Sequence, residues 1–380
     1  MGSGKASCET PVSGKNNYFN TTMKEVRILA INPGSTSTKI AVYQDSEPIF
    51  LKNIKHTPED LQPFHKISDQ FHFRKDIILK QLHEADITLD DVHAVMGRGG
   101  LLKPIPSGVY EVNEAMIHDL EHSPLGEHAS NLGGLIAHDI ALELPDAKAY
   151  IADPIVVDEL DDISRISGHP LFERISIFHA LNHKAIAREY AKANQKRYED
   201  LNLIVVHLGG GITVGAHKKG RVIDVNQGLD GEGPFTPERS GTLPVGALIR
   251  LCFSGKYTMK EVLAMNKGCG GLMAHLGTNN AAEVEKMVEA GDEKAKMIYN
   301  AMAYQVAKYV GEMYVALKCE VDAILITGGI AYDKNFVSFI QDYVQKIAPV
   351  HVFPGEDEMR ALAMNGLLLI KGELQAKVYK

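Results

Sequence analysis

The chain has 380 residues, of which 45% are hydrophobic and 23% charged, proportions that are typical of a folded, soluble protein. This length exceeds what one ordinary hydrophobic core supports, so two domains are expected. The formal net charge of −8 argues against nucleic acid or an anionic membrane as the main partner. A phosphate-bearing ligand stays compatible with that charge, because a few local arginines and backbone N–H groups suffice to bind one.

The cysteines and the N-terminal residues indicate the compartment. Four cysteines without a CxxC pair do not resemble a disulfide framework or a zinc site, and they favour the reducing cytoplasm. No uninterrupted apolar run reaches the ~18 residues of a membrane span. Residues 1–22 are rich in Ser, Gly, Asn and Thr and lack the apolar centre of a signal peptide. We interpret them as a disordered leader or tag.

The first predicted element is a β-hairpin over residues 28–43, ILAINPGSTSTKIAVY. Two apolar runs flank a turn of small residues, the pattern of two strands and a tip. Such a tip presents backbone N–H groups and hydroxyls to an anion. Lys39, on the far side of the turn, either neutralises phosphate charge or is an ordinary surface lysine.

Two charged residues end predicted strands farther along the chain. Arg98, in AVMGRGGLLKP, has no local partner and can fork onto a carboxylate or a phosphate; a structural salt bridge is the alternative. Asp153 ends the run AYIADP. Because the carboxyl end of a strand in an α/β domain faces the ligand cleft, Asp153 is a candidate to bind Mg²⁺ or to orient the acceptor.

Helical periodicity marks residues 116–120, 132–142, 180–193 and 297–317. His179 and His183 lie four residues apart at the start of the third stretch, a spacing that suits a metal pair. Neither a third ligand nor an HExxH pattern supports zinc, so we favour a histidine at a helix start that donates to a phosphoryl oxygen. His128, in GEHASNLGG, is a further cleft candidate.

A second hairpin is predicted over residues 203–217, LIVVHLGGGITVGAH, which repeats the first at a constant offset of 175 residues. The offset pairs Asn32 with His207 and Gly34 with Gly209. One tip per domain could therefore grip a polyphosphate from both sides; two ordinary tight hairpins are the alternative. The run GGGITVG resembles a relaxed GxGxxG, but Rossmann and P-loop turns pass from strand into helix, so a dehydrogenase is disfavoured.

Three segments follow that combine glycine or proline with polar residues. Arg239 lies in the rigid loop GEGPFTPERSGTLP, and such loops often carry function; a salt bridge to Glu238 is the alternative. Gly328 and Gly329 lead from a strand into a helix whose N-terminus could receive adenosine or the α-phosphate. Acids at 356–358 begin the last helix, either because the helix dipole favours them or because one of them binds Mg²⁺.

The alternation of strands and amphipathic stretches predicts an α/β chain with two related domains around a central cleft. We place the first domain at 23–165 plus 358–380, because the last helical stretch is expected to pack back on it. The second domain is placed at 166–357. No distinctive linker marks the boundary between them.

Seven motifs in order over about 24–378 closely resemble the butyrate kinase family, in the acetate kinase branch of the actin-like ATPase superfamily. They are NPGSTSTK, GRGGLL, HASNLGG, HALNHKA, HLGGGI, GEGPFTPERSG and PGEDEM. The resemblance implies duplicated ribonuclease-H-like domains and ATP-dependent phosphorylation of a short-chain carboxylate, with butyrate as the favoured acid. It also implies ATP and Mg²⁺ as cofactors and a homodimer or higher homo-oligomer.

The resemblance also implies roles for individual positions. Nucleotide and phosphate binding falls on three glycine-containing loops, at Asn32, Ser35, Ser37, Lys39, His207, Gly209, Gly210, Gly211, Gly328, Gly329 and Ile330. Two arginines that flank the phosphoryl group, a transition-state histidine and an aspartate form the catalytic set: Arg98, Arg239, His179 and Asp153. The Mg²⁺ ligands are expected among Asn32, Asp153, Glu356 and Glu358. The acid pocket is expected at Gly99, Gly100, His128, Asn131 and Phe178.

The preferred acid is a separate question. Acetate-specific relatives carry a bulky aliphatic residue after the first arginine, where this chain has Gly99 and Gly100. The missing side chain should leave room for further methylenes, each worth about 0.8 kcal/mol if buried. Because apolar pockets discriminate weakly between homologues, isobutyrate, propionate and acetate are the alternative substrates.

Other classes of protein compete with a carboxylate kinase. A sugar kinase of the same superfamily would need an aspartate base beside a hydroxyl. A non-catalytic actin-like or chaperone ATPase would change shape with nucleotide, but it would not require two cleft arginines.

Overall fold

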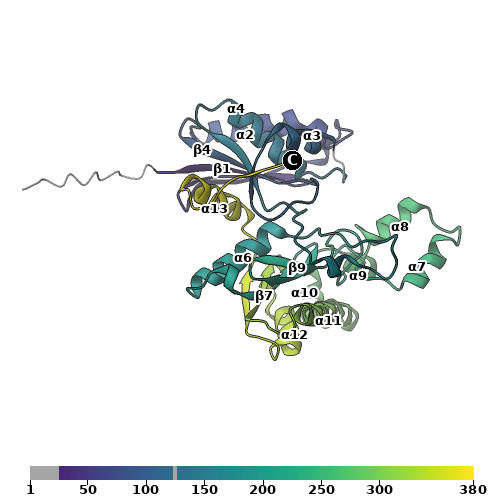
Figure 1. Cartoon of the computed structure of the whole chain (residues 1–380). Helices are drawn as coiled ribbons and strands as arrows, with labels where there is room; N and C mark the ends of the chain where they lie inside the picture. Colours follow the sequence, from purple (N-terminus) through teal and green to yellow (C-terminus); the bar gives the residue numbers. More distant parts are fainter. Residues whose placement is uncertain (1–24, 123–125) are drawn as a thin grey trace, which may run out of the picture.

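The computed structural model describes residues 25–122 and 126–380, so the predicted leader at 1–22 lies outside the described residues. The described chain forms two β-sheets that are flanked by helices (Figure 1). The first sheet has seven strands in the order β12-β5-β6-β4-β1-β2-β3, and the second has five in the order β11-β10-β7-β8-β9.

The strands are short and mostly apolar. Those of the first sheet are β1 (Arg27–Pro33), β2 (Ser37–Gln44), β3 (Glu47–Lys55), β4 (Val92–Arg98), β5 (Val109–Glu111), β6 (Lys148–Ala152) and β12 (Lys377–Val378). Those of the second sheet are β7 (Asn202–Leu208), β8 (Ile212–Lys218), β9 (Arg221–Val225), β10 (Ala323–Gly328) and β11 (Val350–Pro354).

The second sheet repeats the arrangement of β6-β4-β1-β2-β3. In both sheets three antiparallel strands are joined by hairpins, and two parallel strands follow on the other side. Strands β1 and β7 begin and end 175 residues apart, the offset of the sequence repeat. The tips differ in register, because Pro33 pairs with Thr38 whereas Leu208 pairs with Ile212. The second tip is therefore one residue shorter than the first.

Helices cover both faces of the first sheet (Figure 1). One face carries α2 (Phe71–Glu84), α3 (Glu114–His122) and α4 (Asn131–Leu142), and the opposite face carries α13 (Glu358–Ile370). Helix α4 approaches β4 so closely that a Cβ on Gly97 would overlap the backbone of Gly133. Glycine at both positions lets the helix lie on the strand that ends in Arg98.

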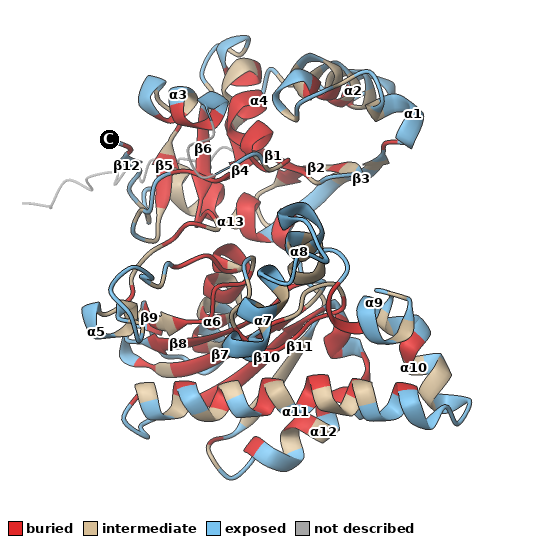
Figure 2. Ribbon diagram, turned by 90° about the vertical axis from the view of Figure 1, so that its right-hand side faces the viewer, coloured by how far each residue is buried: buried red, intermediate tan, exposed pale blue. Residues whose placement is uncertain are grey.

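The second sheet lies between α6 (Ala180–Ala193) on one face and α11 (Glu293–Ala316) with α12 (Lys334–Val344) on the other (Figures 1 and 2). Leu181 of α6 shares a buried cluster with Met359 and Leu362 of α13. Helices α6 and α13 therefore form the layer where the two sheets' cores meet. Helix α13 begins at Glu358, and α6 directly follows His179, and both of these are predicted site residues.

The remaining helices are shorter. They are α1 (Pro58–Leu61), α5 (Asp162–Arg165), α7 (Val245–Cys252), α8 (Met259–Asn266), α9 (Gly271–Leu276) and α10 (Ala281–Glu289). Helices α7 and α8 project from the second half and contain no buried residue (Figures 1 and 2). Apolar side chains, including Val245, Ile249 and Met259, are exposed on them.

The end of the chain returns to the first sheet. Strand β12 pairs in parallel with β5, beside the buried Tyr379. The Tyr379 hydroxyl donates to Asp119 Oδ2 at 2.7 Å and accepts from the backbone N–H of Lys103 at 3.2 Å. Within the described residues, none of the helices combines the length and apolar character that crossing a membrane requires.

Candidate active site

The first hairpin tip is clamped from behind by an arginine that the sequence analysis did not select. Arg74 of α2 is fully buried, and its Nη1 donates to the carbonyl oxygens of Gly34 and Ser37 at 2.8 and 3.0 Å. Its Nη2 donates to the carbonyl oxygen of Ser35 at 3.2 Å. Burial lowers the pKa of Arg74 to about 10, so the guanidinium stays charged at neutral pH. The tip is therefore held rigid while Ser35 itself stays exposed.

A buried amide, an arginine and a carboxylate meet at the floor of the first half. Asn32 precedes Pro33, the last residue of β1, and its Nδ2 donates to Glu358 Oε2 at 2.6 Å. Arg98 Nη1 donates to the same Glu358 oxygen at 2.8 Å and to Asn32 Oδ1 at 3.2 Å. Glu358, the first residue of α13, is 8% exposed. The acid at 358, rather than its exposed neighbour Glu356, thus joins the first strand of the sheet to Arg98.

The second half contributes two stacked histidines and an arginine beside the glycine tip. The rings of His179 and His207 lie 3.8 Å apart and nearly parallel. A Cβ on Gly211 would overlap the guanidinium of Arg239 and come within 3.3 Å of the His179 ring. Arg239 donates to the carbonyl oxygen of Gly228, while its buried Nε has no partner in the described residues. Part of the guanidinium is therefore available to a ligand.

The two arginines act on the same histidines. The pKa of His128 falls to about 4 because of burial and because of the charges of Arg98, Lys267 and Arg239. Burial and the same two arginines lower the pKa of His179 and His207. The positive charges contributed by the two halves thus converge on one region, which is suited to an anion.

His207 is neutral at physiological pH. Its Nε2 lies 3.4 Å from Glu356 Oε2, a contact that would be an ion pair only if the ring were protonated. Burial lowers the pKa of His207 to about 4 despite the opposing effect of Glu358, so protonation near pH 7 is disfavoured. We therefore describe the contact as polar. On the other side of the ring, Nδ1 lies 2.8 Å from Asn182 Oδ1.

Asp153 has partners on both carboxylate oxygens. Its Oδ1 accepts from Ser107 Oγ at 2.6 Å and from the Gly108 N–H at 2.9 Å. Its Oδ2 accepts from Arg188 Nη1 at 3.1 Å. The backbone φ of +39° is unusual for an aspartate and is held by these contacts. Asp153 lies beside Arg98 and His179 in the wall of one hollow, but its catalytic and metal roles stay predictions.

Gly99 and Gly100 do not border open space. A Cβ on Gly99 would lie 2.5 Å from Pro154 Cβ, and one on Gly100 would overlap the Asn131 side chain. Asn131 Oδ1 also accepts from the Leu101 N–H at 2.8 Å. Close packing between loop and helix explains glycine at these positions. The room that the sequence argument assigned to the acyl chain is therefore filled at both glycines.

Other predicted pocket residues divide between two places. His128 and Asn131 line a small hollow with the apolar side chains Leu120, Leu132 and Leu135. Phe178 is buried, with its ring 5.2 Å from His183 and perpendicular to it. Phe178 thus lies behind His179, whereas His128 and Asn131 border an apolar space.

The third glycine loop connects β10 to a short 3₁₀ turn, Gly329–Tyr332, before α12 begins. Gly328 has a φ of +98°, and a Cβ there would overlap the backbone of Leu208. The N–H groups at the start of α12 are already satisfied, since Asp333 accepts from Asn335 and Phe336. The expectation that this helix N-terminus receives a phosphate is therefore not supported. The exposed backbone at Gly329, before buried Ile330, is the open part of the loop.

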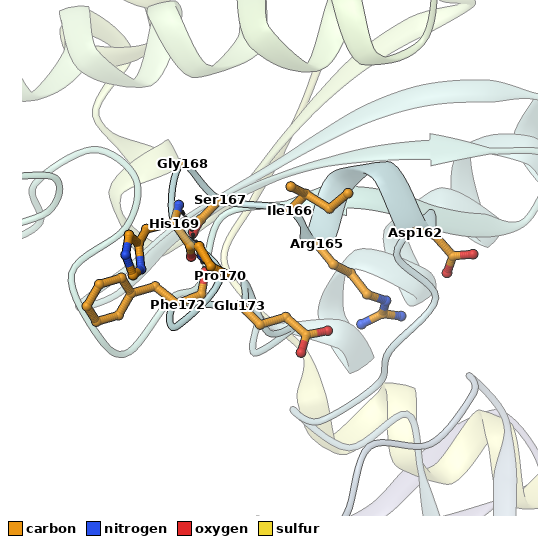
Figure 3. A pocket seen from close by; sticks show the side chains of 9 residues that line it. All are labelled: Asp162, Arg165, Ile166, Ser167, Gly168, His169, Pro170, Phe172 and Glu173. Atoms are coloured by element: carbon orange, nitrogen blue, oxygen red, sulfur yellow. Dashed lines mark hydrogen bonds between the residues drawn. The ribbon is translucent and has the colours of Figure 1, made fainter.

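A larger hollow lies away from these residues. It is formed by the loop after α5 and is lined by Asp162, Arg165, Ile166, Ser167, Gly168, His169, Pro170, Phe172 and Glu173 (Figure 3). Arg165 points to Asp158, with which it makes a 2.6 Å ion pair. None of the predicted site residues lines this hollow, so we do not assign the active site to it.

Four buried side chains extend behind His179 in a row. His179 Nδ1 lies 2.9 Å from Thr213 Oγ1, which lies 2.9 Å from His183 Nε2. The row continues from His183 Nδ1 to His217 Nε2 at 3.2 Å, and from His217 Nδ1 to the Tyr198 hydroxyl at 2.6 Å. His179 and His183 therefore share a threonine and do not converge as a metal pair. In the part of the chain that the structure describes, no group of three metal-ligating side chains was found.

Two halves that repeat one strand arrangement, each with a hairpin tip, and two arginines that act on the same histidines are the features of a phosphotransferase of the actin-like ATPase fold. Solved acetate kinases from Porphyromonas gingivalis and Entamoeba histolytica share this fold with TM-scores of 0.70 and 0.71, at 18% and 17% identity; each alignment covers 91% of this chain and 100% of the other. A propionate kinase from Francisella tularensis superposes with a TM-score of 0.68 at 20% identity, over 90% of this chain and 98% of the other. The expected fold class is confirmed.

Sequence relatives identify the family. The Acetokinase family model matches residues 173–359. Butyrate kinase 1 and butyrate kinase 2 of Clostridium acetobutylicum are 56% and 54% identical over 93% of this chain and 99% of each relative. A probable butyrate kinase from Phocaeicola vulgatus is 55% identical over the same shares. The chain belongs to the butyrate kinase family. The resemblance noted from the motifs and the predicted enzyme class are confirmed.

Sequence reasoning missed the residues that support the site. Arg74 lies on the apolar face of α2 with Ile78 and Leu82. A charged residue at such a position predicts a buried side chain with polar partners, so this residue could have been found from the sequence. Arg188, the partner of Asp153, carries no comparable signal, because it lies on α6 among ordinary helix formers. Its role depends on a contact across 35 positions of the chain.

Proposed function

We propose that this chain transfers the γ-phosphoryl group of ATP to the carboxylate of butyrate, giving butyryl phosphate and ADP in a reversible reaction. The observation that carries the proposal is the convergence of Arg98 and Arg239, whose charges both lower the pKa of His128, His179 and His207. Such a region suits a transferring phosphoryl group and an acceptor carboxylate, both of which are anionic. The family relationship supports the same reaction.

The chemistry asks for positioning and charge stabilisation. A carboxylate is ionised at neutral pH, so its oxygen can attack the γ-phosphorus in line without a strong general base. We assign Arg98 and Arg239 to the acceptor carboxylate and the equatorial phosphoryl oxygens, with His179 as a neutral hydrogen-bond donor. The tips at Ser35–Ser37 and Gly209–Gly211 bind the polyphosphate through backbone N–H groups. Asp153 then has no direct role in the transfer and holds the cleft wall in place through Ser107 and Arg188.

Mg²⁺ is the metal whose chemistry the donors fit. Asn32 Oδ1 and the Glu358 carboxylate are buried oxygen donors in one cluster, and Mg²⁺ prefers a few such oxygens together with water and substrate phosphates. The ion would neutralise charge on the β- and γ-phosphates. Asp153 fits less well, because both of its oxygens already accept hydrogen bonds, whereas in the described residues the hydrogen bonds to Glu358 all fall on Oε2 and leave Oε1 for the ion. Among the predicted acids we therefore prefer Glu358, with Glu356 as an outer contact.

The acyl chain requires an apolar space next to the arginines. We propose that it extends toward the hollow bordered by His128, Leu132 and Leu135, because the space beside Gly99 and Gly100 is filled. Isobutyrate and other short acids are the alternative substrates, since such a pocket discriminates by about 1–3 kcal/mol per methylene.

The assay that tests the function measures ADP release with acetate, propionate, butyrate, isobutyrate, valerate and glucose. We expect the highest kcat/KM with butyrate and no reaction with glucose. Hydroxylamine should trap the product as a hydroxamate, which identifies an acyl phosphate. A preference for glucose, or ATP hydrolysis that no acid stimulates, would contradict the proposal.

We also propose that the protein is cytoplasmic and self-associates at least as a dimer. The three cysteines in the described range, Cys252, Cys269 and Cys319, are unpaired, which supports a reducing compartment. The exposed apolar side chains of α7 and α8 support self-association. Sedimentation should therefore give a mass of at least two chains, and a monomeric mass would refute self-association.

The domain boundaries belong to the same proposal. We infer that residues 23–165 with 358–380 and residues 166–357 act as two domains that close on the nucleotide. The packing of α13 and β12 on the first sheet supports this division.

A further inference from the structure

The row of side chains behind His179 is closed to solvent. Thr213, His183 and His217 are fully buried, and Tyr198 is 4% exposed. The four hydrogen-bond distances along the row range from 2.6 to 3.2 Å. Each histidine uses its Nδ1 in the row, and His183 and His217 also use Nε2. Only His179 Nε2 is left outside the row.

Each histidine in the row carries one ring hydrogen. Burial, followed by the neighbouring positive or ring groups, lowers the pKa of His179, His183 and His217 well below 6.5, so the rings are neutral at physiological pH. A neutral imidazole donates through one nitrogen and accepts through the other. In the described residues Thr213 Oγ1 makes hydrogen bonds only to the rings of His179 and His183, so the hydroxyl hydrogen must also lie in the row. If His217 donates to Tyr198, every donor in the row therefore points toward Tyr198; if His217 accepts from Tyr198, every donor points toward His179. A fully hydrogen-bonded row thus has two arrangements.

Tyr198 decides between the two arrangements. If the His217 ring donated to the phenol oxygen, the phenol's own hydrogen would need another acceptor. In the described residues the Tyr198 hydroxyl makes no other hydrogen bond. A buried hydroxyl hydrogen without an acceptor is unfavourable, because the group has given up its hydrogen bond to water and gains none in the protein. Tyr198 therefore donates to His217 Nδ1.

The direction then follows link by link. His217 accepts at Nδ1, so its hydrogen lies on Nε2 and is donated to His183 Nδ1. His183 in turn donates from Nε2 to Thr213 Oγ1, and the Thr213 hydroxyl donates to His179 Nδ1. The hydrogen of His179 is consequently on Nε2. His179 borders the hollow that Arg98 and Glu358 also line.

We propose that Tyr198, His217, His183 and Thr213 are positioning residues that fix His179 as the Nε2–H tautomer, ready to donate to a phosphoryl oxygen. The inference rests on the proposed phosphoryl transfer for its functional meaning, but the tautomer itself does not. The reversed row would present a lone pair at Nε2, which would repel the anionic phosphoryl oxygen. Tyr198 thus determines from the far end of the row whether the active-site histidine attracts or repels the group in transfer.

Nitrogen-15 NMR of histidine-labelled protein tests the tautomer without substrate. We expect a protonated Nε2 and an unprotonated Nδ1 for His179, assigned by comparison with a His179→Gln variant. In Tyr198→Phe the phenol donor is lost, and the His179 signals should shift toward a mixture of tautomers. A wild-type His179 protonated at Nδ1, or one unaltered by Tyr198→Phe, would overturn the proposal.

Kinetics test the functional half. Tyr198→Phe and Thr213→Val should lower kcat by about tenfold or more with little change in the KM for ATP, because the donor acts on the transferring group. Thr213→Ser, which keeps the hydroxyl, should retain most of kcat. Tyr379→Phe is the matched control, because it removes another buried tyrosine hydroxyl, one that bonds Asp119 at the edge of the first sheet.

The readouts separate the possible failures. If the row had only a structural role, Thr213→Ser and Thr213→Val would lower the stability of the protein equally, and Thr213→Ser would not retain more kcat than Thr213→Val. If Tyr198→Phe changes the tautomer but leaves kcat unchanged, the positioning role is wrong. If the wild-type chain phosphorylates no carboxylate but shows the Nε2–H tautomer, the proposed function fails and the tautomer assignment stands.

Discussion

At the scale of single residues, the two cleft arginines differ in how much of their charge is already engaged. Arg98 forms a 2.8 Å ion pair with Glu358. Arg239 has only a distant acid, Glu238 at 3.9 Å, and its buried Nε has no partner in the described residues. Burial accordingly lowers the pKa of Arg239. A buried guanidinium with unused donors is costly unless a ligand completes it, so we expect Arg239 to contribute more to catalysis than to folding.

Replacement of Arg239 tests this assignment. Arg239→Ala should lower kcat by about 100-fold or more, because a donor to the developing phosphoryl charge is lost. The unfolding temperature should stay within a few degrees of wild type, since few contacts of Arg239 stabilise the fold. Arg250→Ala, on the exposed face of α7, serves as the control. Full activity in Arg239→Ala would remove this arginine from the mechanism.

Arg74 shows the opposite behaviour at the same scale. Its guanidinium satisfies three carbonyl oxygens of the first tip and also donates to Gln70 Oε1 at 2.8 Å. Each of these oxygens that is left buried without a donor costs about 1–3 kcal/mol. Its contribution is to hold the tip that we propose binds the phosphates.

We therefore predict that Arg74→Leu raises the KM for ATP by about tenfold and lowers the free energy of unfolding by several kcal/mol, because several neutral oxygens lose their donor. Urea denaturation and initial-rate kinetics measure the two effects. Lys80→Ala, at an exposed position of the same helix, is the matched control and should change neither quantity. A variant with wild-type stability would show that the clamp is dispensable.

At the scale of elements, both hairpins were predictable because their apolar runs and small-residue tips have the periodicity of strands and turns. The sequence offset also matched β1 to β7 residue by residue. The difference in tip length was not predictable from the offset of 175 residues, which aligns Thr38 with Thr213. Thr38 is the first paired residue after the first tip, whereas Thr213 is the second paired residue after the second tip. Register at a tip depends on the backbone pairing that each turn permits.

The second tip offers a test with a built-in control. Gly211→Ala should lower kcat by about tenfold or more, because the new methyl group would displace Arg239 and press on His179. Gly210→Ala changes the same loop, but its Cβ would meet no atom within 4 Å. The ratio of kcat in the two variants is the measurement. Equal kcat values would contradict the prediction, because they would mean that Arg239 can shift away from a methyl group at residue 211 without loss of activity.

The structure brings some of the predicted site residues together, and it does not support the explanation given for others. Arg98, Arg239, His179, His207 and Glu358 were selected because polar residues in glycine-rich, non-periodic segments gather at clefts, and the structure brings them together. The explanation for Gly99 and Gly100 was not supported, because a missing side chain in sequence does not reveal which neighbour fills its space. Supporting contacts such as Arg188 with Asp153 join distant segments and leave no local pattern.

At the scale of the whole molecule, the buried histidines make stability depend on pH. The pKa of His128 and His207 is lowered to about 4, and burial holds the pKa of His179, His183 and His217 well below 6.5. In the unfolded chain these rings take up protons near pH 6.5. Below that pH the unfolded state binds more protons than the folded state, so acid favours unfolding.

We expect the free energy of unfolding to fall between about pH 7 and about pH 5.5, by about 1 kcal/mol for each buried histidine. The loss should continue toward pH 4, where His128 and His207 begin to be protonated in the folded state. Urea denaturation at several pH values measures the slope. His65→Gln, at an exposed position, should leave the slope unchanged. A free energy that is constant or rises on acidification would contradict the burial of these rings as neutral groups.

The order of strands along the chain also has a consequence for biosynthesis. The second sheet is complete once Pro354 has been made, whereas the first sheet still lacks α13 and β12. Until α13 leaves the ribosome, the apolar residues that it covers, including Ile28 and Met96, have no partner from this helix. Nascent chains that end before Glu358 are therefore expected to engage chaperones or to aggregate, and not to persist as half-enzymes.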